Sequence, residues 1–180
     1  MIFFIGAGPG DPELMTIKGA KLLGQCDVVI YAGSLVNPKV LNYARENSII
    51  YDSAGMNLQE VIDVMKRAHS QGKHVARVHT GDPSIYGAIR EQMDSLDKLE
   101  IPFEVIPGVS SFTASSAVLK RELTLPGASQ TIIITRAEGR TPVPEGEDLK
   151  SLAKAKATMV IFLSVDKIQK VTKDLAREYS

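Results

Sequence analysis

The sequence predicts an α/β fold with two domains: an N-terminal domain built on a parallel sheet and a second, smaller α/β domain. Apolar runs without polar alternation recur through the first part of the chain, which is typical of parallel strands covered on both faces. Amphipathic segments separate these runs, and turn-forming residues break the rhythm near position 125. The five expected strands are Ile2–Ile5, Val28–Tyr31, Ile49–Tyr51, Val75–Val78 and Phe103–Ile106.

Polar residues mark the expected starts of the intervening helices. Asn37 followed by Pro38 is a typical N-cap with proline at the first helical position. Asn57 and Glu60 have the spacing of a capping box. The helix that follows is expected to end at Gly72 and to carry one apolar stripe, formed by Leu58, Val61, Ile62, Met65 and Ala68.

Two further helices are expected before the first domain ends. Ser84 is the expected N-cap of one, whose apolar stripe is Ile85, Ile89, Met93 and Leu96. The other covers Ser110–Leu119, and its small side chains would let it pack close to the sheet. Five strand and helix pairs therefore fill a first domain at residues 1–121.

A linker at residues 122–130, "ELTLPGASQ" for Glu122–Gln130, combines proline, glycine and polar residues. A second domain at residues 131–180 follows, with expected strands Thr131–Thr135 and Thr158–Leu163 and helices at about 148–155 and from Asp166. Two strands rarely bury enough apolar surface to stand alone. We therefore expect a truncated second domain, or one supported by the first domain or by a partner.

Composition excludes several classes of function. Lysine plus arginine and aspartate plus glutamate both number 21, so the chain has no basic field for nucleic acid. The single cysteine, Cys26, is expected to be a small core residue in a reducing cytoplasm, and with the three histidines it forms no metal-ligand spacing. The initial "MIFFIGAG" is too short for a signal peptide or membrane span and is expected to be a buried strand.

The first loop, "IGAGPGDPELMT" at Ile5–Thr16, is glycine-rich without matching a phosphate-binding motif. Its glycines have the spacing G-x-G-x-G, so they match neither the dinucleotide fingerprint nor a Walker loop. Asp11 would repel a phosphate, while Pro9 and Pro12 lack N–H donors. The loop is thus expected to allow close approach of a ligand other than an anion, or simply to connect strand and helix.

Two more small-residue loops follow strands. They are "HTGDPSIYG" at His79–Gly87 and "IPGVSS" at Ile106–Ser111. Because ligands bind at the carboxyl ends of parallel strands, three such loops favour a shared pocket over three generic turns. Asp11 and Asp82 are interpreted as hydrogen-bonded turn carboxylates rather than a catalytic pair. For His79, the sequence favours a structural role over the role of a general base.

A fourth loop, "TRAEGRTPVPEGE" at Thr135–Glu147, lies in the second domain. Arg136 and Arg140 could bind carboxylates in a bidentate manner there. The alternative is a solvated loop with surface arginines. No nucleophile, catalytic triad or metal site is apparent in the sequence.

Taken in order, "GAGPGDPELMTIKG", "VHTGDPSIYGAI", "VIPGVSS" and "TRAEGRTPVPE" resemble the tetrapyrrole methylase family. The resemblance implies the two-domain tetrapyrrole methylase fold, S-adenosylmethionine as cofactor with S-adenosylhomocysteine as product, a tetrapyrrole substrate and a cytoplasmic homodimer. The last stretch is similar to the corrin branch that methylates carbon 11 of precorrin-4 or cobalt-precorrin-4 during cobalamin (vitamin B12) biosynthesis. Neither nucleic acid nor a membrane is expected as a partner.

The resemblance also implies which residues line the cofactor site. Because a tetrapyrrole carries several carboxylate arms, Arg136 and Arg140 are expected, on chemical grounds, to bind the substrate carboxylates. Several relatives carry an aspartate, proposed as a proton acceptor, where this chain has Gly33, so we assign no catalytic residue. The expected cofactor residues are Pro9, Thr80, Gly81, Asp82, Ile85, Ser110, Ser111 and Leu163.

Other functions stay open at this point. Relatives continue beyond the position of Ser180, so the chain is expected to be truncated, and a fragment that only binds ligand is one alternative. Methylation of another corrin intermediate or of uroporphyrinogen is a second alternative. A nicotinamide-dependent oxidoreductase is disfavoured by the glycine spacing.

Overall fold

A computed structural model describes residues 1–139 and 141–179 of the chain. It contains two compact units, Met1–Ala114 and Ser115–Ser180, which are treated separately below. The division falls within helix α4 (Ser111–Leu119). The domain limits expected from the sequence, 1–121 and 131–180 with a linker at 122–130, stay predictions.

The first unit is built on a five-stranded parallel sheet, as predicted. Its strands run in the order β3-β2-β4-β1-β5, so β1 lies between β4 and β5, with Ile2 opposite Val75 and Phe103. Three strands extend one residue beyond the expected limits. The strands are β1 (Ile2–Gly6), β2 (Val28–Tyr31), β3 (Ile49–Asp52), β4 (Val75–His79) and β5 (Phe103–Ile106).

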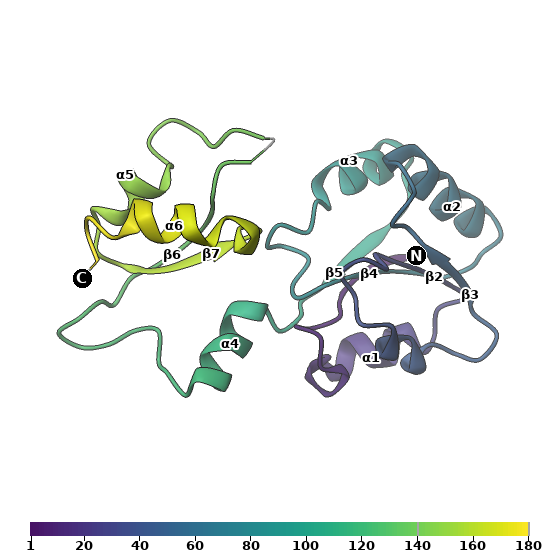
Figure 1. The fold of residues 1–180 in the computed structure, drawn as a ribbon. Helices are drawn as coiled ribbons and strands as arrows, with labels where there is room; N and C mark the ends of the chain where they lie inside the picture. The colour runs from purple at the N-terminus through teal and green to yellow at the C-terminus, as the bar shows by residue number, and fades with distance from the viewer. Residues whose placement is uncertain (140, 180) are drawn as a thin grey trace. The chain divides into compact units, whose positions relative to one another are not determined.

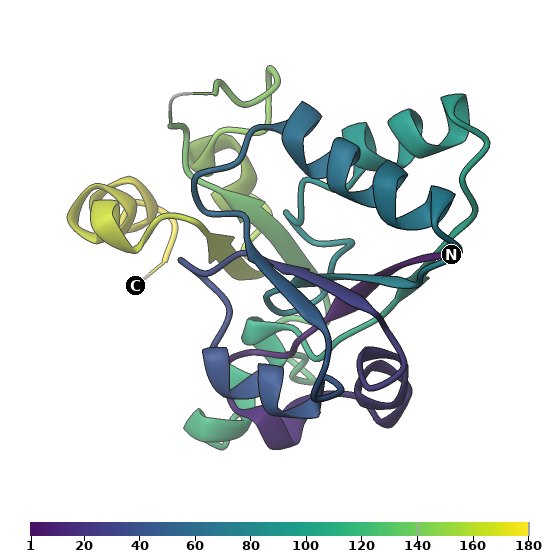
Figure 2. The same ribbon diagram turned by 90° about the vertical axis from the view of Figure 1, so that its right-hand side faces the viewer.

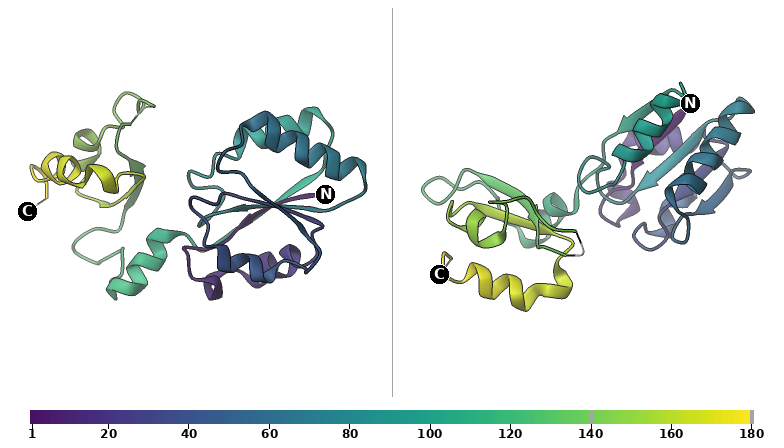
Figure 3. Two further views of the ribbon diagram at one scale, coloured as in Figure 1. Left: turned by 45° about the vertical axis from the view of Figure 1, so that its right-hand side comes forward. Right: turned by 90° about the horizontal axis from the view of Figure 1, so that it is seen from above.

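Helices cover both faces of this sheet (Figure 1). Helices α2 (Leu58–Ser70) and α3 (Arg90–Lys98) lie on one face, and α1 (Ile17–Leu23) and the 3-10 helix η2 (Pro38–Tyr43) lie on the other (Figure 2 and the left panel of Figure 3). Two apolar clusters fill the layers, because side chains of each strand alternate between the faces. This two-sided burial accounts for the apolar character of strands β1 and β2.

Cys26 belongs to the second of these clusters and is completely buried. Burial raises the pKa of its thiol to about 12, so the group is uncharged at neutral pH. The expected role as a small core residue is confirmed.

Helix α2 begins as predicted. The Asn57 side chain accepts from the Glu60 N–H and the Glu60 carboxylate accepts from the Asn57 N–H, which completes the capping box. Val61, Ile62, Met65 and Ala68 are buried, but Leu58 is 45% exposed. Four of the five residues of the apolar stripe are therefore buried, and the fifth, Leu58, is the first residue of the helix.

The expected helix start at Ser84 was wrong. Residues 83–86 form a turn, and α3 begins at Arg90 after Ile89, whose side chain makes no capping bond. Tyr86 and Ala88 have φ angles of 53° and 50°, which are incompatible with a continuous right-handed helix. The cap predicted at Asn37 is present, although the helix that it caps, η2, is a 3-10 helix.

Helix α4 forms where the sequence predicts a helix, but its environment differs. None of its residues is buried, and none belongs to a core cluster. Val118 is 82% exposed. Packing of this helix close to the sheet stays a prediction, since the division between the two units falls within the helix.

The second unit contains a parallel pair of strands, β6 (Ile132–Arg136) and β7 (Thr158–Phe162). Helices α5 (Leu149–Ala153) and α6 (Ile168–Leu175) pack with Met159 and Ile161 of β7 around a small core. The short 3-10 helix η3 (Val165–Lys167) precedes α6. All four predicted elements are present in this unit, and no described helix is both long and apolar enough to cross a membrane.

Candidate functional site

Three glycine-containing loops of the first unit lie together at the carboxyl ends of β1, β4 and β5. Gly8 and Gly81 form a two-residue antiparallel bridge, in which the Gly81 N–H donates to the Gly8 carbonyl at 2.7 Å and Gly8 returns a bond at 3.3 Å. A Cβ on Gly108 would lie 2.1 Å from the Gly81 carbonyl oxygen. The structure therefore confirms that the loops share one edge of the sheet, with contacts that only glycine permits.

Asp82 connects the second loop to the third. One carboxylate oxygen accepts from the Ser84 N–H at 2.8 Å and the other accepts from the Gly108 N–H at 3.0 Å. Asp11 similarly accepts from the Glu13 N–H and caps the 3-10 helix η1 (Pro12–Leu14). Both aspartates are hydrogen-bonded turn carboxylates, as predicted.

The remaining expected cofactor residues of the first unit differ in exposure. Thr80 and Ser111 are exposed, Pro9 and Ile85 are half-buried, and Gly81 and Ser110 are buried. Gly10 has open space around it, since a Cβ there would meet no atom within 4 Å. Of the expected cofactor residues, Thr80 and Ser111 thus present exposed hydroxyl groups at this edge of the sheet.

His79 ends β4 beneath these loops and is 6% exposed. Burial, followed by the nearby charge of Arg77, lowers the pKa of its imidazole to about 3. Its Nε2 atom has no hydrogen-bond partner among the described residues, and its ring stacks at a tilt on Phe4. An imidazole that is buried and uncharged at neutral pH supports the structural role that the sequence favoured.

The position of Gly33, where several relatives carry an aspartate, is filled by a different carboxylate. Asp52 at the end of β3 accepts from the Gly33 N–H at 3.0 Å and from the Ala54 N–H at 2.9 Å. A Cβ on Gly33 would lie 2.2 Å from an Asp52 carboxylate oxygen. Sequence reasoning missed Asp52, because residues 33 and 52 become neighbours only through the pairing of β2 with β3.

In the second unit, Arg136 is used within its own loop. Its Nη1 donates to the Thr141 carbonyl at 3.0 Å, and its Nη2 donates to the Pro142 carbonyl at 2.9 Å. Arg140 lies outside the described residues. Leu163 is 66% exposed with a φ of 52°, a left-handed conformation that is uncommon for leucine.

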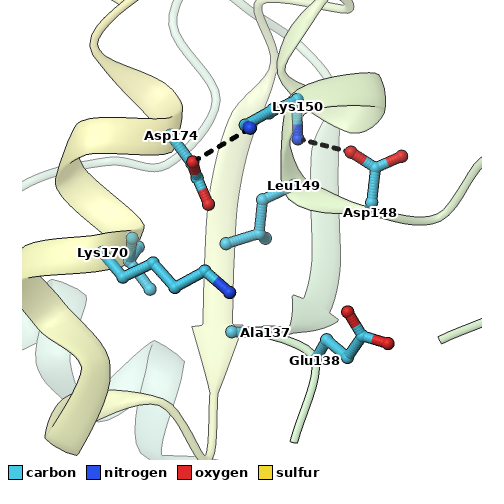
Figure 4. Close-up of a pocket in the computed structure, with 8 residues that line it drawn as sticks. Ala137, Glu138, Asp148, Leu149, Lys150, Lys170 and Asp174 are labelled. Atoms are coloured by element: carbon cyan, nitrogen blue, oxygen red, sulfur yellow. Dashed lines mark hydrogen bonds and ion pairs between the residues drawn. The ribbon is translucent and has the colours of Figure 1, made fainter. Parts of the chain in front are cut away.

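The second unit also contains a pocket of about 180 Å³ (Figure 4). Lys150 Nζ lies 3.4 Å from an Asp174 carboxylate oxygen, and Asp148 caps α5. The Lys170 side chain extends toward Ala137 in this view. Two lysines and three carboxylates line the pocket, so its charges do not favour an anion. Among the described residues, no group of three histidine, cysteine or acidic side chains could hold a metal ion.

Known proteins place this arrangement in a family. The sequence model of the family described as tetrapyrrole (corrin/porphyrin) methylases matches residues 1–180 of this chain. This chain belongs to the tetrapyrrole methylases. The family resemblance seen in the sequence motifs is therefore confirmed, together with the fold that it implies.

Curated relatives of this methylase include two C(11)-methyltransferases. The cobalt-precorrin-4 C(11)-methyltransferase of Methanocaldococcus jannaschii is 63% identical over 174 residues, which cover 97% of this chain and 67% of the relative. The precorrin-4 C(11)-methyltransferase of Pseudomonas aeruginosa is 47% identical, with 99% of this chain and 71% of the relative covered. The methylase thus spans about two thirds of the length of these relatives.

Solved structures agree with this assignment. The X-ray structure of a cobalt precorrin-4 methyltransferase has a TM-score of 0.95 at 48% identity and covers 98% of this methylase and 74% of that chain. A uroporphyrin-III C-methyl transferase from Thermus thermophilus, complexed with S-adenyl homocysteine, has a TM-score of 0.79 at 29% identity. That match covers 99% of this methylase and 72% of the Thermus chain. Both matches support the two-domain methylase fold.

Proposed function

We propose that this methylase transfers the methyl group of S-adenosylmethionine to carbon 11 of precorrin-4 or cobalt-precorrin-4 in cobalamin biosynthesis. The observation that carries the proposal is the 63% and 47% identity to C(11)-methyltransferases over nearly the whole chain. The uroporphyrinogen-III C-methyltransferase of Bacillus subtilis is only 32% identical over a similar length. The difference favours the corrin substrate over uroporphyrinogen.

The loops of the first unit fit such a cofactor. The three loops contain the carboxylates of Asp11 and Asp82 and no lysine or arginine within residues 6–12, 80–89 and 107–111. A cationic sulfonium suits this composition, whereas a phosphate does not. We therefore propose that the cofactor site is lined by Pro9, Thr80, Gly81, Asp82, Ile85, Ser110, Ser111 and Leu163.

The hydrogen bonds of Asp82 define its part in this site. Both of its carboxylate oxygens already accept backbone N–H groups, so Asp82 mainly fixes the shape of the second and third loops. The exposed hydroxyls of Thr80 and Ser111 are the side-chain groups that can bond a nucleoside or an amino-acid moiety. Asp82 also adds negative charge that favours a cationic ligand.

S-adenosylmethionine, when bound, supplies a methyl group on a sulfonium, which is already a strong electrophile. The contribution of the chain is then to hold the reactants in line, and good alignment can lower a barrier by ~7–11 kcal/mol. Glycine contacts and the Asp82 bonds make the loops stiff, as alignment requires. No residue is assigned as a general base, and His79 is unsuited to that role because it is buried and its lowered pKa makes it a weak base.

The two arginines of the fourth loop are assigned different roles toward the substrate. We propose that Arg140 binds a substrate carboxylate and that Arg136 serves mainly by holding the loop that carries it, since Nη1 and Nη2 of Arg136 bond loop carbonyls. A cytoplasmic homodimer is proposed on the family resemblance, and size-exclusion chromatography with light scattering tests the dimer.

Two measurements test the function. Calorimetry should detect binding of S-adenosylhomocysteine to this chain and none of NADH. Reaction of purified precorrin-4 or cobalt-precorrin-4 with ¹³C-methyl-labelled S-adenosylmethionine should then give a labelled methyl on carbon 11 by NMR. Label on another carbon would overturn the regiochemistry, and binding without turnover would identify a fragment that only binds ligand.

A further inference from the structure

A second pocket lies in the first unit, on the face of the sheet covered by α2 and α3. Its volume is about 440 Å³. It is formed where β3 and β4 approach their carboxyl ends and where α2 and α3 begin. The residues that the argument uses are Ser53, Asn57, Arg77, Ala88, Glu91 and Gln92.

Arg77 is the unusual member of this lining. It is 8% exposed in the middle of β4, and burial lowers the pKa of its guanidinium to about 10, so it stays positively charged at neutral pH. It forms no ion pair with any carboxylate in residues 1–139 or 141–179. A buried charge without a counter-ion is unfavourable, so the site is suited to an incoming anion.

Neutral groups hold the guanidinium in place. Arg77 Nε donates to Gln92 Oε1 at 3.2 Å, and Nη1 donates to Ser53 Oγ at 2.8 Å and, more weakly, to the Ile30 carbonyl at 3.5 Å. Gln92 is itself fixed by donating to the Ala88 carbonyl at 3.0 Å. None of the bonds found within the described part of the chain uses Nη2, so its two N–H donors remain for a ligand.

The charge around the pocket limits the kind of anion. Glu91, which is exposed, lines the same pocket and adds a negative charge. The uncapped first turn of α3 adds a modest positive potential. One buried arginine opposed by one carboxylate suits a monoanionic carboxylate better than a phosphate dianion, which needs more positive charge.

We propose that this pocket binds a carboxylate through Nη2 of Arg77. Given the proposed function, on which this identification of the ligand rests, the carboxylate is an acetate or propionate arm of the tetrapyrrole. The pocket would then fix the orientation of the bound macrocycle by holding a carboxylate arm that is remote from the reacting carbon. Arg77 is a binding residue here and takes no part in bond making.

The test uses the whole 180-residue chain with labelled arginine side chains. In ¹⁵N NMR spectra, sodium propionate should shift the Arg77 guanidinium resonances, whereas the neutral isostere propionamide and sodium chloride at equal ionic strength should not. Arg77→Lys assigns the resonance and should weaken propionate binding about tenfold, because lysine keeps the charge but loses the planar fork. Glu91→Gln should tighten binding about twofold to fivefold by removing the opposing charge.

Three results would overturn the proposal. These are no Arg77 shift with propionate in the wild-type chain, an equal shift with propionamide, and an equal shift with chloride. The wild-type titrations decide the matter even if Arg77→Lys does not fold. Parallel calorimetry with S-adenosylhomocysteine distinguishes the carboxylate pocket from the proposed cofactor site. Cofactor binding without an Arg77 shift overturns only the pocket. An Arg77 shift without cofactor binding overturns only the cofactor site.

Discussion

Arg77 and His79 show how one environment gives two residues different charge states. Both side chains are buried and two positions apart on β4, so they point to the same face of the sheet. Burial disfavours the charged form of each, and the lowered pKa values are about 10 and about 3. At neutral pH the arginine therefore keeps its charge and the histidine loses it.

The buried His79 predicts a pH dependence of stability. Below its ordinary pKa of 6.5 the imidazole is protonated in the unfolded chain but stays neutral in the folded chain down to about pH 3. The unfolded state then binds more protons, so stability falls as the pH is lowered through this window. The free energy of unfolding should drop by about 2 kcal/mol between pH 7 and pH 5 through this one group.

Urea denaturation at both pH values measures this effect. His79→Gln should remove the contribution, since glutamine does not titrate, and carboxylates contribute equally to both proteins. An identical pH dependence in the variant and the wild-type chain would show that His79 is accessible to protons in the folded state.

At the scale of elements, the carboxyl ends of β1, β4 and β5 are joined by contacts between loop backbones. A Cβ on Gly6 would lie 2.6 Å from Gly108 Cα, and one on Gly108 would lie 2.8 Å from Gly6 Cα. The Asp82 carboxylate also accepts a hydrogen bond from the Gly108 N–H. The loops that carry the proposed cofactor site thus depend on one another for their shape.

Gly108→Ala should therefore destabilise the fold by ~1–3 kcal/mol, because the new methyl group meets backbone atoms that cannot move cheaply. The same change should weaken binding of S-adenosylhomocysteine. Urea denaturation and calorimetry measure the two effects. Gly55→Ala is the matched control, since a Cβ at Gly55 meets nothing within 4 Å, and it should leave both quantities nearly unchanged. If the two variants behave alike, the loop contacts are loose in solution.

At the scale of the whole molecule, the two units differ in the size of their cores. The sheet of the first unit is covered on both faces by large apolar clusters, whereas the buried cluster described in the second unit consists of Ala137, Leu149 and Val171. Ile134 on β6 remains 41% exposed. The stability of the second unit should consequently be the lower of the two.

Hydrogen-deuterium exchange followed by mass spectrometry tests this difference. Peptides that contain β6 and β7 should exchange roughly tenfold or more faster than peptides that contain β1 and β4, since local opening costs less free energy where little apolar surface is buried. Equal protection of both strand pairs would mean that the units unfold as one cooperative body.

The sequence by itself determined which elements form. Apolar runs, the Asn57 capping box and the glycine loops are local patterns, and each encodes a strand, a helix start or a turn through the conformational preferences of neighbouring residues. It also placed three loops at one edge, because parallel strands share their carboxyl ends. Family motifs in those loops then indicated the methylase and its cofactor.

Only the tertiary structure decided which residues meet across the sheet. The order β3-β2-β4-β1-β5 brings Gly81 against Gly8, and packing sets Asp82 on Gly108 and Asp52 in the space beside Gly33. Sequence analysis did not single out Arg77, although a charged residue within a predicted buried strand is a sequence feature that could have indicated the pocket. Such contacts join residues far apart in the chain, so they follow from the packing of the whole sheet and not from local preference.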